Sequence, residues 1–375
     1  MADLKAQVMD VLRTIQDPEV PKDLVTLNMI KNVAVAGGAV TIDIDLTTPA
    51  CPLKDQISRD VTGKVRAIPG VTDVKINFGA QVRSEARQGG GLPNVKHIVA
   101  VGSGKGGVGK STVAANIALA LAGDGARVGL MDLDVYGPSI PLIMGVQGMR
   151  PEVSEKANRI MPVERLGIRI ISFGFFVPAQ EATIVRGPIL AGIVRQFLND
   201  VEWGDLDYIV VDLPPGTGDI QLSLCQMIPL TGAVVVTTPQ DVALLVATKA
   251  ITMFNKLQVP MLGMIENMSS FICPHCQKTT DIFGHGGARA AAHRMNIPFL
   301  GEIPLDPAIR FAENDGVPIV RAKPDSAQAR AFLEAARNTA ARISMRVLGA
   351  GSDDLDRVMA KSATLFRGAQ TAGKH

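Results

Sequence analysis

Short apolar runs alternate with stretches of helical periodicity along most of the chain after residue 96. The apolar runs are His97–Val101, Arg127–Met131, Tyr208–Val211, Ala233–Thr237, Met261–Ile265 and Phe299–Ile303. Because these runs are apolar on both faces, they are typical of parallel strands that helices cover on both sides. The pattern predicts an α/β domain with a mostly parallel sheet over residues 96–348, which ends in a long helix over Ser326–Leu348.

The first 83 residues follow a different pattern. A helical face spans residues 8–15, and apolar and polar residues then alternate over residues 40–46. Such alternation predicts a half-buried strand. A second helix is expected from Pro52 and a closing strand over Val71–Asn77. We therefore expect a small α+β domain over residues 1–83.

Two segments lack a regular pattern. Residues 84–95 contain three consecutive glycines and no apolar periodicity, which predicts a flexible linker. Residues 349–375 are expected to form a C-terminal tail, in which Leu355–Phe366 is weakly amphipathic.

Composition excludes several classes of protein. The formal net charge is +2 and aromatic residues make up 4%, so we expect no binding to nucleic acid. No apolar stretch reaches the ~18 residues of a membrane span, and the N-terminus does not resemble a secretory signal. Four cysteines in 375 residues do not make a disulfide framework. We expect a cytoplasmic protein with reduced thiols and no membrane partner.

A glycine-rich segment directly follows the first of these apolar runs. Its residues Gly104 to Ser111 have the spacing of a phosphate loop, in which glycines let successive N–H groups point at an anion. Lys110 is expected to meet the β and γ phosphates, and Ser111 to ligate Mg²⁺. The residues expected to bind nucleotide are Gly104, Lys105, Gly106, Gly107, Val108, Gly109, Lys110, Ser111 and Thr112. The segment predicts a site for ATP and Mg²⁺.

Acidic residues follow two of the predicted strands. Asp132 and Asp134 come after the second strand, and Asp212 ends the third. Ligands gather at the carboxyl ends of parallel strands, where these carboxylates are expected. We expect Asp132 and Asp212 to hold Mg²⁺ and Asp134 to orient the attacking water. Taken alone, each aspartate also fits a helix cap or a turn.

A second lysine lies inside the loop, at Lys105. Only Lys110 can follow the loop into the helix, so Lys105 either faces a second molecule or is solvated. The run Lys-Gly-Gly-Val-Gly-Lys-Ser-Thr resembles the deviant Walker A ATPases, in which the first lysine reaches the nucleotide of a partner subunit. The resemblance implies a homodimer with a catalytic role for both lysines.

Two cysteines lie three residues apart, at Cys273 and Cys276. Such a pair serves as a metal clip, a redox dithiol or a disulfide. A tetrahedral site needs four ligands, and two-fold symmetry would supply them from two identical clips. Four thiolates suit a 4Fe–4S cluster or zinc, and the spacing leaves that choice open. Cys225 lies in a predicted helix and is expected to be a buried core thiol.

Four segments together resemble the Mrp/ApbC family of iron–sulfur cluster carrier ATPases. They are Gly104–Thr112, Asp132–Ser139, Asp212–Asp219, and Glu266-Asn-Met-Ser with Cys273-Pro-His-Cys276. The resemblance implies a homodimer that holds a labile cluster on Cys273 and Cys276. It also implies slow ATP hydrolysis coupled to cluster transfer, with apo iron–sulfur proteins and cluster-assembly factors as partners. By the same resemblance Asn267 contacts adenine; otherwise it is a turn residue at a strand end.

The N-terminal domain resembles the small MIP-type domain of cluster-assembly factors. Asp17-Pro-Glu, Asp23-Leu-Val and Thr48-Pro-Ala-Cys-Pro carry the resemblance. Cys51 is expected at a helix start, where the helix dipole favours a thiolate and hence reactivity or metal contact. Cys51 also fits a half-buried capping thiol.

Two other functions fit part of the pattern. A ParA/MinD-type positioning ATPase explains Lys105 and the sheet, but leaves Cys273 and Cys276 without a role. An ATPase whose dimer is joined by structural zinc explains the cysteines without cluster delivery.

Overall fold

The computed structural model describes residues 2–18, 20, 22–84, 92–154, 158–176, 187–273, 275–276 and 278–349. The chain divides into two compact units, residues 1–84 with 340–375 and residues 85–339. We call them the first and the second unit. Most of the expected linker and all of the expected segment Leu355–Phe366 lie outside the described residues.

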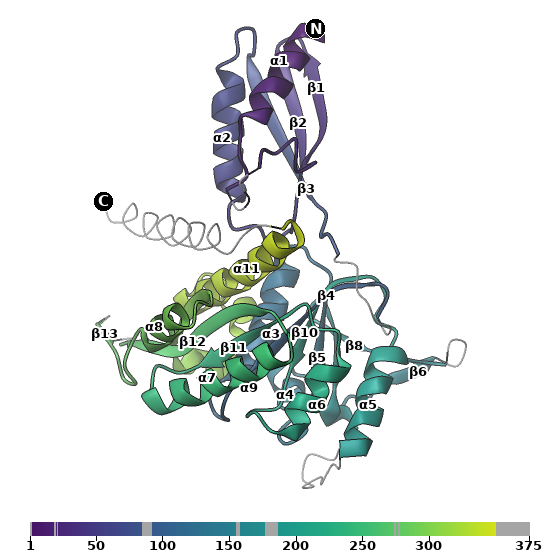
Figure 1. Ribbon diagram of the computed structural model, residues 1–375, viewed down its shortest axis with the longest axis vertical. Helices are drawn as coiled ribbons and strands as arrows, with labels where there is room; N and C mark the ends of the chain where they lie inside the picture. Colours follow the sequence, from purple (N-terminus) through teal and green to yellow (C-terminus); the bar gives the residue numbers. More distant parts are fainter. Residues whose placement is uncertain are drawn as a thin grey trace. The chain divides into compact units, whose positions relative to one another are not determined.

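The first unit is a three-stranded sheet with two helices (Figure 1). Its elements are α1 (Ala2–Arg13), β1 (Ile30–Ala36), β2 (Ala39–Leu46), α2 (Lys54–Arg66) and β3 (Asp73–Ala80). Strand β2 lies between an antiparallel β1 and a parallel β3. Every second residue of β2, from Val40 to Leu46, is buried, which confirms the expected half-buried strand. These side chains form one core with Leu12 of α1 and Val61 of α2.

The second unit contains a nine-stranded sheet in the order β13-β12-β11-β4-β10-β5-β9-β8, with β14 paired to β12. The strands are β4 (Val95–Gly102), β5 (Val128–Asp132), β8 (Val163–Arg165), β9 (Ile168–Ser172), β10 (Leu206–Asp212), β11 (Gly232–Thr237), β12 (Met261–Ile272), β13 (Thr279–Thr280) and β14 (Phe299–Leu305). Every pairing is parallel except β8 with β9 and β12 with β13. A separate hairpin joins β6 (Glu152–Ser154) and β7 (Arg159–Met161). The mostly parallel sheet is confirmed.

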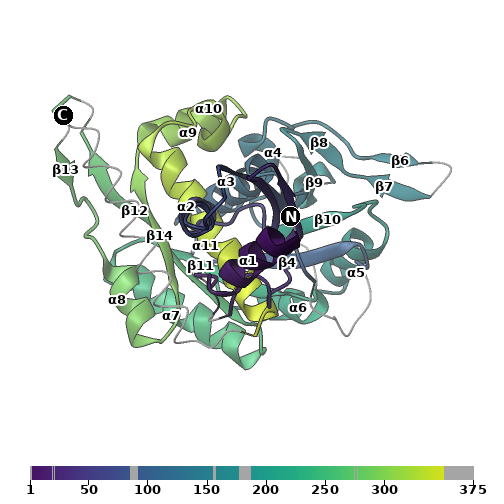
Figure 2. The same ribbon diagram turned by 90° about the horizontal axis from the view of Figure 1, so that it is seen from above.

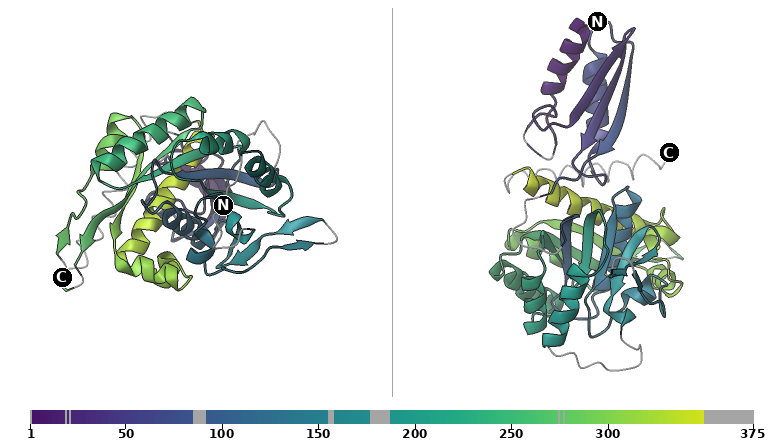
Figure 3. Two further views of the ribbon diagram at one scale, coloured as in Figure 1. Left: turned by 90° about the horizontal axis from the view of Figure 1, so that it is seen from below. Right: turned by 90° about the vertical axis from the view of Figure 1, so that its right-hand side faces the viewer.

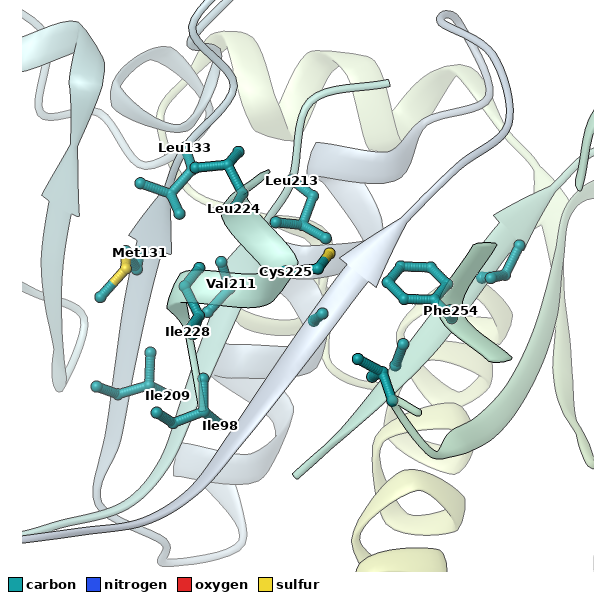
Figure 4. Packing of buried hydrophobic residues seen from close by; sticks show 14 of the residues in the cluster. Ile98, Met131, Leu133, Ile209, Val211, Leu213, Leu224, Cys225, Ile228 and Phe254 are labelled. Atoms are coloured by element: carbon teal, nitrogen blue, oxygen red, sulfur yellow. The ribbon is translucent and has the colours of Figure 1, made fainter. Parts of the chain in front are cut away.

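Helices cover both faces of this sheet (Figures 2 and 3). They are α3 (Lys110–Gly123), α4 (Ile140–Ile143), α5 (Gly187–Asn199), α6 (Asp219–Met227), α7 (Asp241–Lys256), α8 (Gly287–Arg294), α9 (Pro307–Asn314), α10 (Ile319–Ala322) and α11 (Ala327–Val347), with a 3₁₀ turn at Phe173–Phe175. Apolar side chains of α5, α6, α7 and α8 share one core with the sheet. Figure 4 shows Leu224 and Cys225 of α6 among Ile98, Met131 and Val211.

Helix α11 confirms the long helix that the sequence predicted at this position. Its residues from Ala340 group with the first unit, where Met345 is part of the buried core. Within the described ranges, no helix combines the length and hydropathy that crossing a bilayer demands.

Candidate nucleotide site and cysteine clip

The phosphate loop and the acidic residues lie at the carboxyl ends of three adjacent strands. Strand β10 pairs with β4 on one side and with β5 on the other, in parallel. In this register Asp212 lies opposite Val101, just before the loop, and opposite Asp132. The sheet therefore brings together the loop and the two carboxylates that the sequence placed at strand ends.

The glycines of the loop have two different physical roles. Gly107 and Gly109 have φ angles of 79° and 78°, a left-handed conformation that favours glycine. Gly106 and Gly107 have open space where a side chain would be. A Cβ atom on Gly104 would collide with the backbone of Val246 in α7, and one on Gly109 with the amide of Asn267. Part of the loop thus faces open space while its ends pack tightly on α7 and β12.

Lys110 begins α3 and is buried among carboxylates. Its Nζ atom donates a 2.5 Å hydrogen bond to Asp212 Oδ1 and lies 3.3 Å from Asp134 Oδ2. Burial disfavours the charge, but the Asp212 and Asp134 carboxylates outweigh it and raise the pKa of Lys110 above its ordinary value. Lys110 is therefore a fixed positive charge at the base of the loop, next to the Ser111 hydroxyl at 3.3 Å.

Asp132 is completely buried and has a hydrogen-bond donor on each oxygen. Ser172 Oγ donates to Oδ2 at 2.7 Å, and the Asp134 backbone N–H donates to Oδ1 at 3.0 Å. Burial, together with the nearby charge of Asp212, raises the pKa of Asp132 to about 8. Asp132 therefore holds the turn that positions Asp134.

Asp212 has one oxygen bound to Lys110 and one without a partner. Its Oδ2 atom is buried and accepts no hydrogen bond within the described part of the chain. Burial raises the pKa of this carboxyl, and Lys110 opposes the rise. The Asp212 carboxylate, which has an unpartnered oxygen, and the neighbouring Ser111 hydroxyl together form a set of hard oxygen donors, which fits Mg²⁺.

Lys105 is partly buried, and no ion pair involving its ammonium is found in the described ranges. Its backbone carbonyl accepts a 2.9 Å hydrogen bond from Ser103 Oγ, which closes the loop on itself. The catalytic role of Lys105 stays a prediction.

Strand β12 connects the loop to the cysteine pair. Asn267 is buried, and its Nδ2 atom donates a 2.8 Å hydrogen bond to the carbonyl of Val108 in the loop. Directly after it, Met268 has a φ of 57°, at an irregularity in the pairing with β14. The strand then continues to Ile272 and leads into Cys273.

Cys273 and Cys276, which we call the cysteine clip, lie at the tip of a short hairpin. Strand β13 pairs back onto the end of β12, and the Cys273 N–H donates to the Lys278 carbonyl at 3.0 Å. Cys273 is half-buried, Cys276 is exposed, and neither is in a disulfide. Hydrogen bonds from the backbone N–H groups of Cys276 and His275 lower the pKa of Cys273 below its ordinary value. The Cys273 sulfur therefore ionises more readily than that of an ordinary cysteine, and the Cys276 side chain lies next to it.

Comparison with known proteins identifies the family. The model of the NUBPL iron-transfer P-loop NTPases matches residues 94–340, and that of an iron–sulfur cluster assembly protein matches residues 5–78. The chain belongs to the family of iron-transfer P-loop NTPases. The resemblance of both parts that the sequence motifs indicated is confirmed.

Individual relatives agree with the family match. The chain is 50% identical to the "Iron-sulfur cluster carrier protein" of Deinococcus radiodurans over 91% of its length and 96% of that protein. It is 47% identical to the protein of the same name from Synechocystis, over 91% and 98%. One similar solved structure is a nucleotide-binding protein from Archaeoglobus fulgidus, in complex with ADP and with cobalt found in it. Its TM-score against this chain is 0.53. That protein is 41% identical to the chain, and the match covers 60% of this chain and 87% of that one.

The sequence also predicts roles for two other cysteines of this iron-transfer NTPase, Cys225 and Cys51. Cys225 is buried, which confirms the expected core thiol, and burial raises its pKa to about 12. The expected helix start at Pro52 is wrong, because α2 begins at Lys54. Leu53 is buried and its carbonyl accepts the first helical hydrogen bond, so Leu53 and not Cys51 stands at the N-cap position. Cys51 instead packs into the apolar core of the first unit.

Sequence reasoning gave no role to three residues around these sites. Ser172 donates a hydrogen bond to Asp132 from β9, a strand that lies between β5 and β8 and has no sequence motif of its own. Glu266, next to Asn267, accepts hydrogen bonds from the N–H groups of Gly286 and Ala288 and so caps α8. Gln221 of α6 is buried near the loop. Only the position of Glu266 beside Asn267 was a usable signal, since the other contacts join distant segments.

Proposed function

We propose that the chain is an ATP-dependent carrier that binds an iron–sulfur cluster between two copies of itself and transfers it to apoproteins. The observation that carries this proposal is the path of β12. One strand touches the phosphate loop through Asn267 and leads into the cysteine clip at Cys273. Names of relatives that are 50% and 47% identical support a cluster as the cargo.

Residues of the loop and of the neighbouring strands would bind the nucleotide. In the proposal Lys110 contacts the β and γ phosphates, while Ser111 and Asp212, together with Asp132, hold Mg²⁺. Bound Mg²⁺ would neutralise phosphate charge during hydrolysis. Asp134 lies 3.3 Å from Lys110, where its carboxylate would orient the attacking water. Asn267 would contact the adenine.

A second copy completes the cargo site in this proposal. Each clip supplies two thiolates, and a 4Fe–4S cluster needs four. A homodimer with its two-fold axis between the clips provides them. The same dimer would bring Lys105 to the nucleotide of the partner. Apo iron–sulfur proteins and cluster-assembly factors are the proposed partners.

Anaerobic reconstitution with iron and sulfide tests the cargo. We expect about four iron and four sulfide atoms per dimer in the wild type, and a large loss in Cys273→Ala and in Cys276→Ala. Cys225→Ala is the matched control, because Cys225 is a buried thiol of the sheet core, and it should retain the cluster. A Cys273→Ala variant that takes up as much iron as the wild type would refute the proposal.

Metal and sulfide analysis of the protein before reconstitution decides between a cluster and structural zinc. Four thiolates on two hairpin tips also fit a tetrahedral zinc site. Stoichiometric zinc without iron or sulfide in protein purified under anaerobic conditions would replace cluster delivery with a zinc-joined dimer.

The first unit is proposed to take part in delivery. Cys51 is a thiol in a unit that matches an iron–sulfur cluster assembly protein. If it contacts the cargo during transfer, Cys51→Ala should bind a cluster normally but deliver it to an apoprotein more slowly. Equal transfer rates would show that Cys51 is a packing residue.

A further inference from the structure

Gln221 lies at the junction between the phosphate loop and the segment that follows Asp212. That segment, Leu213–Gly218, is hydrogen-bonded to the start of the loop: Leu213 N–H donates to Val101 at 3.1 Å, and Gly216 N–H donates to Ser103 at 2.9 Å. Helix α6 begins directly afterwards, and Gln221 is in its first turn. Any movement of the segment against the loop therefore moves Gln221.

The amide of Gln221 is buried without being paired. Its side chain is 2% exposed, and neither Oε1 nor Nε2 has a hydrogen-bond partner among the residues that the structure describes. A methyl group on Gly102, the last residue of β4, would lie 3.4 Å from Nε2 and 3.1 Å from the ring of Phe254. The amide thus lies against the backbone that leads into the loop, beside an apolar ring.

A folded protein with an unpaired buried amide is less stable than the same protein with an apolar group of the same shape at that position. Leu224 and Cys225, one turn further along α6, are apolar and belong to the sheet core. A leucine at position 221 would suit this environment better. The chain has a glutamine there, so the amide requires a partner that this arrangement of loop and helix does not provide.

We infer that Gln221 is a positioning residue whose amide hydrogen-bonds the backbone at Gly102–Ser103 when nucleotide occupies the loop. The segment 213–218 has the freedom to move, since Gly216 has a φ of 101° and open space around it. Phosphate binding draws this segment toward the ligand, and α6 follows because Leu222 N–H donates to the Gly218 carbonyl. The new hydrogen bond then fixes the loop against α6 in the form that hydrolyses ATP.

The inference rests on the proposed ATP hydrolysis and deepens it. Gln221→Leu tests it in the full-length chain, with Cys225→Ala on the same helix as the control. We expect Gln221→Leu to raise the thermal midpoint of the nucleotide-free protein and to lower kcat at least about tenfold, with KM nearly unchanged. Cys225→Ala should lower the thermal midpoint and leave kcat unchanged.

Two results would overturn the inference. One is a Gln221→Leu variant that is more stable and fully active, which shows a structural role only. Another is a crystal structure with a non-hydrolysable ATP analogue in which the amide makes no bond to residues 102–103. If Gln221→Leu misfolds, Gln221→Met replaces it, and full activity of that variant has the same meaning. Absence of ATPase activity in the wild type would instead refute the proposed function, so the two failures are distinct.

Discussion

Asn267 and Val108 are 159 residues apart in sequence, yet a buried 2.8 Å hydrogen bond joins the side chain of the first to the carbonyl of the second. The bond ties the phosphate loop to the strand that leads into Cys273. A shift of the loop on nucleotide binding would therefore act on the strand that leads into the cysteine clip.

Replacement of Asn267 by alanine removes this bond and leaves the Val108 carbonyl buried without its donor. The bond is present without nucleotide, so its loss lowers the free energy of unfolding by about 1–3 kcal/mol. The loop that it holds then becomes less ordered, and we expect ATP to bind about tenfold more weakly. The iron content of the reconstituted variant should stay near that of the wild type. Isothermal titration with ATP and iron analysis measure the two effects. An unchanged Kd would show that the loop does not depend on Asn267.

Lys110→Met should destabilise the protein even before nucleotide is added. It leaves the buried Asp212 carboxylate without its positive partner, which costs about 3–5 kcal/mol. The double variant Lys110→Met/Asp212→Asn should recover part of this stability, because the uncompensated charge is gone, but it should not recover ATPase activity. Urea denaturation and phosphate release measure the two. A single variant as stable as the wild type would contradict the argument.

Asp134→Asn should reduce the rate of hydrolysis rather than the affinity for ATP. The asparagine keeps the size of the side chain but loses the charge that would activate water, so we expect kcat to fall about 100-fold with KM little changed. Steady-state kinetics separate the two parameters. If KM rises instead and kcat stays constant, Asp134 binds the nucleotide and another group orients the water.

The thiols should differ in their response to pH. Hydrogen bonds to the Cys273 sulfur lower its pKa, so its thiolate forms at lower pH than in an ordinary cysteine. Burial raises the pKa of Cys225 to about 12, so that thiol stays protonated. We expect iodoacetamide at about pH 7.5 to modify Cys273 and not Cys225, with the rate for Cys273 falling as the pH is lowered through its pKa.

Mass spectrometry of the metal-free protein, after brief reaction at a series of pH values, gives the rate for each cysteine. Cys273→Ser is the control for the assignment of the labelled peptide. Faster labelling of Cys225 than of Cys273 would show that the backbone hydrogen bonds do not stabilise the thiolate.

Local sequence was enough to predict six strands of the nine-stranded sheet, β4, β5, β10, β11, β12 and β14, and the order of loop, helix and acidic residues. Alternation along β2 and the apolar runs of β4 and β10 depend only on neighbouring residues, so they are visible in the chain itself. The short antiparallel strands β8 and β13 have no such pattern, because their pairing with β9 and β12 alone defines them. The predicted start of α2 was wrong for a similar reason. Leu53, the residue before the helix, is buried in the core of the first unit, and the local sequence does not show that contact.

By itself, the sequence determined which chemical groups this protein contains: a phosphate loop, three aspartates at strand ends and a pair of closely spaced cysteines. The type of each residue and its spacing along the chain are fixed by the covalent structure. Only the tertiary structure decided what each group touches, because hydrogen bonds and burial join segments that are far apart in the chain. Ser172 on Asp132, Asn267 on Val108 and the unpaired amide of Gln221 all follow from how the strands and helices pack around the loop.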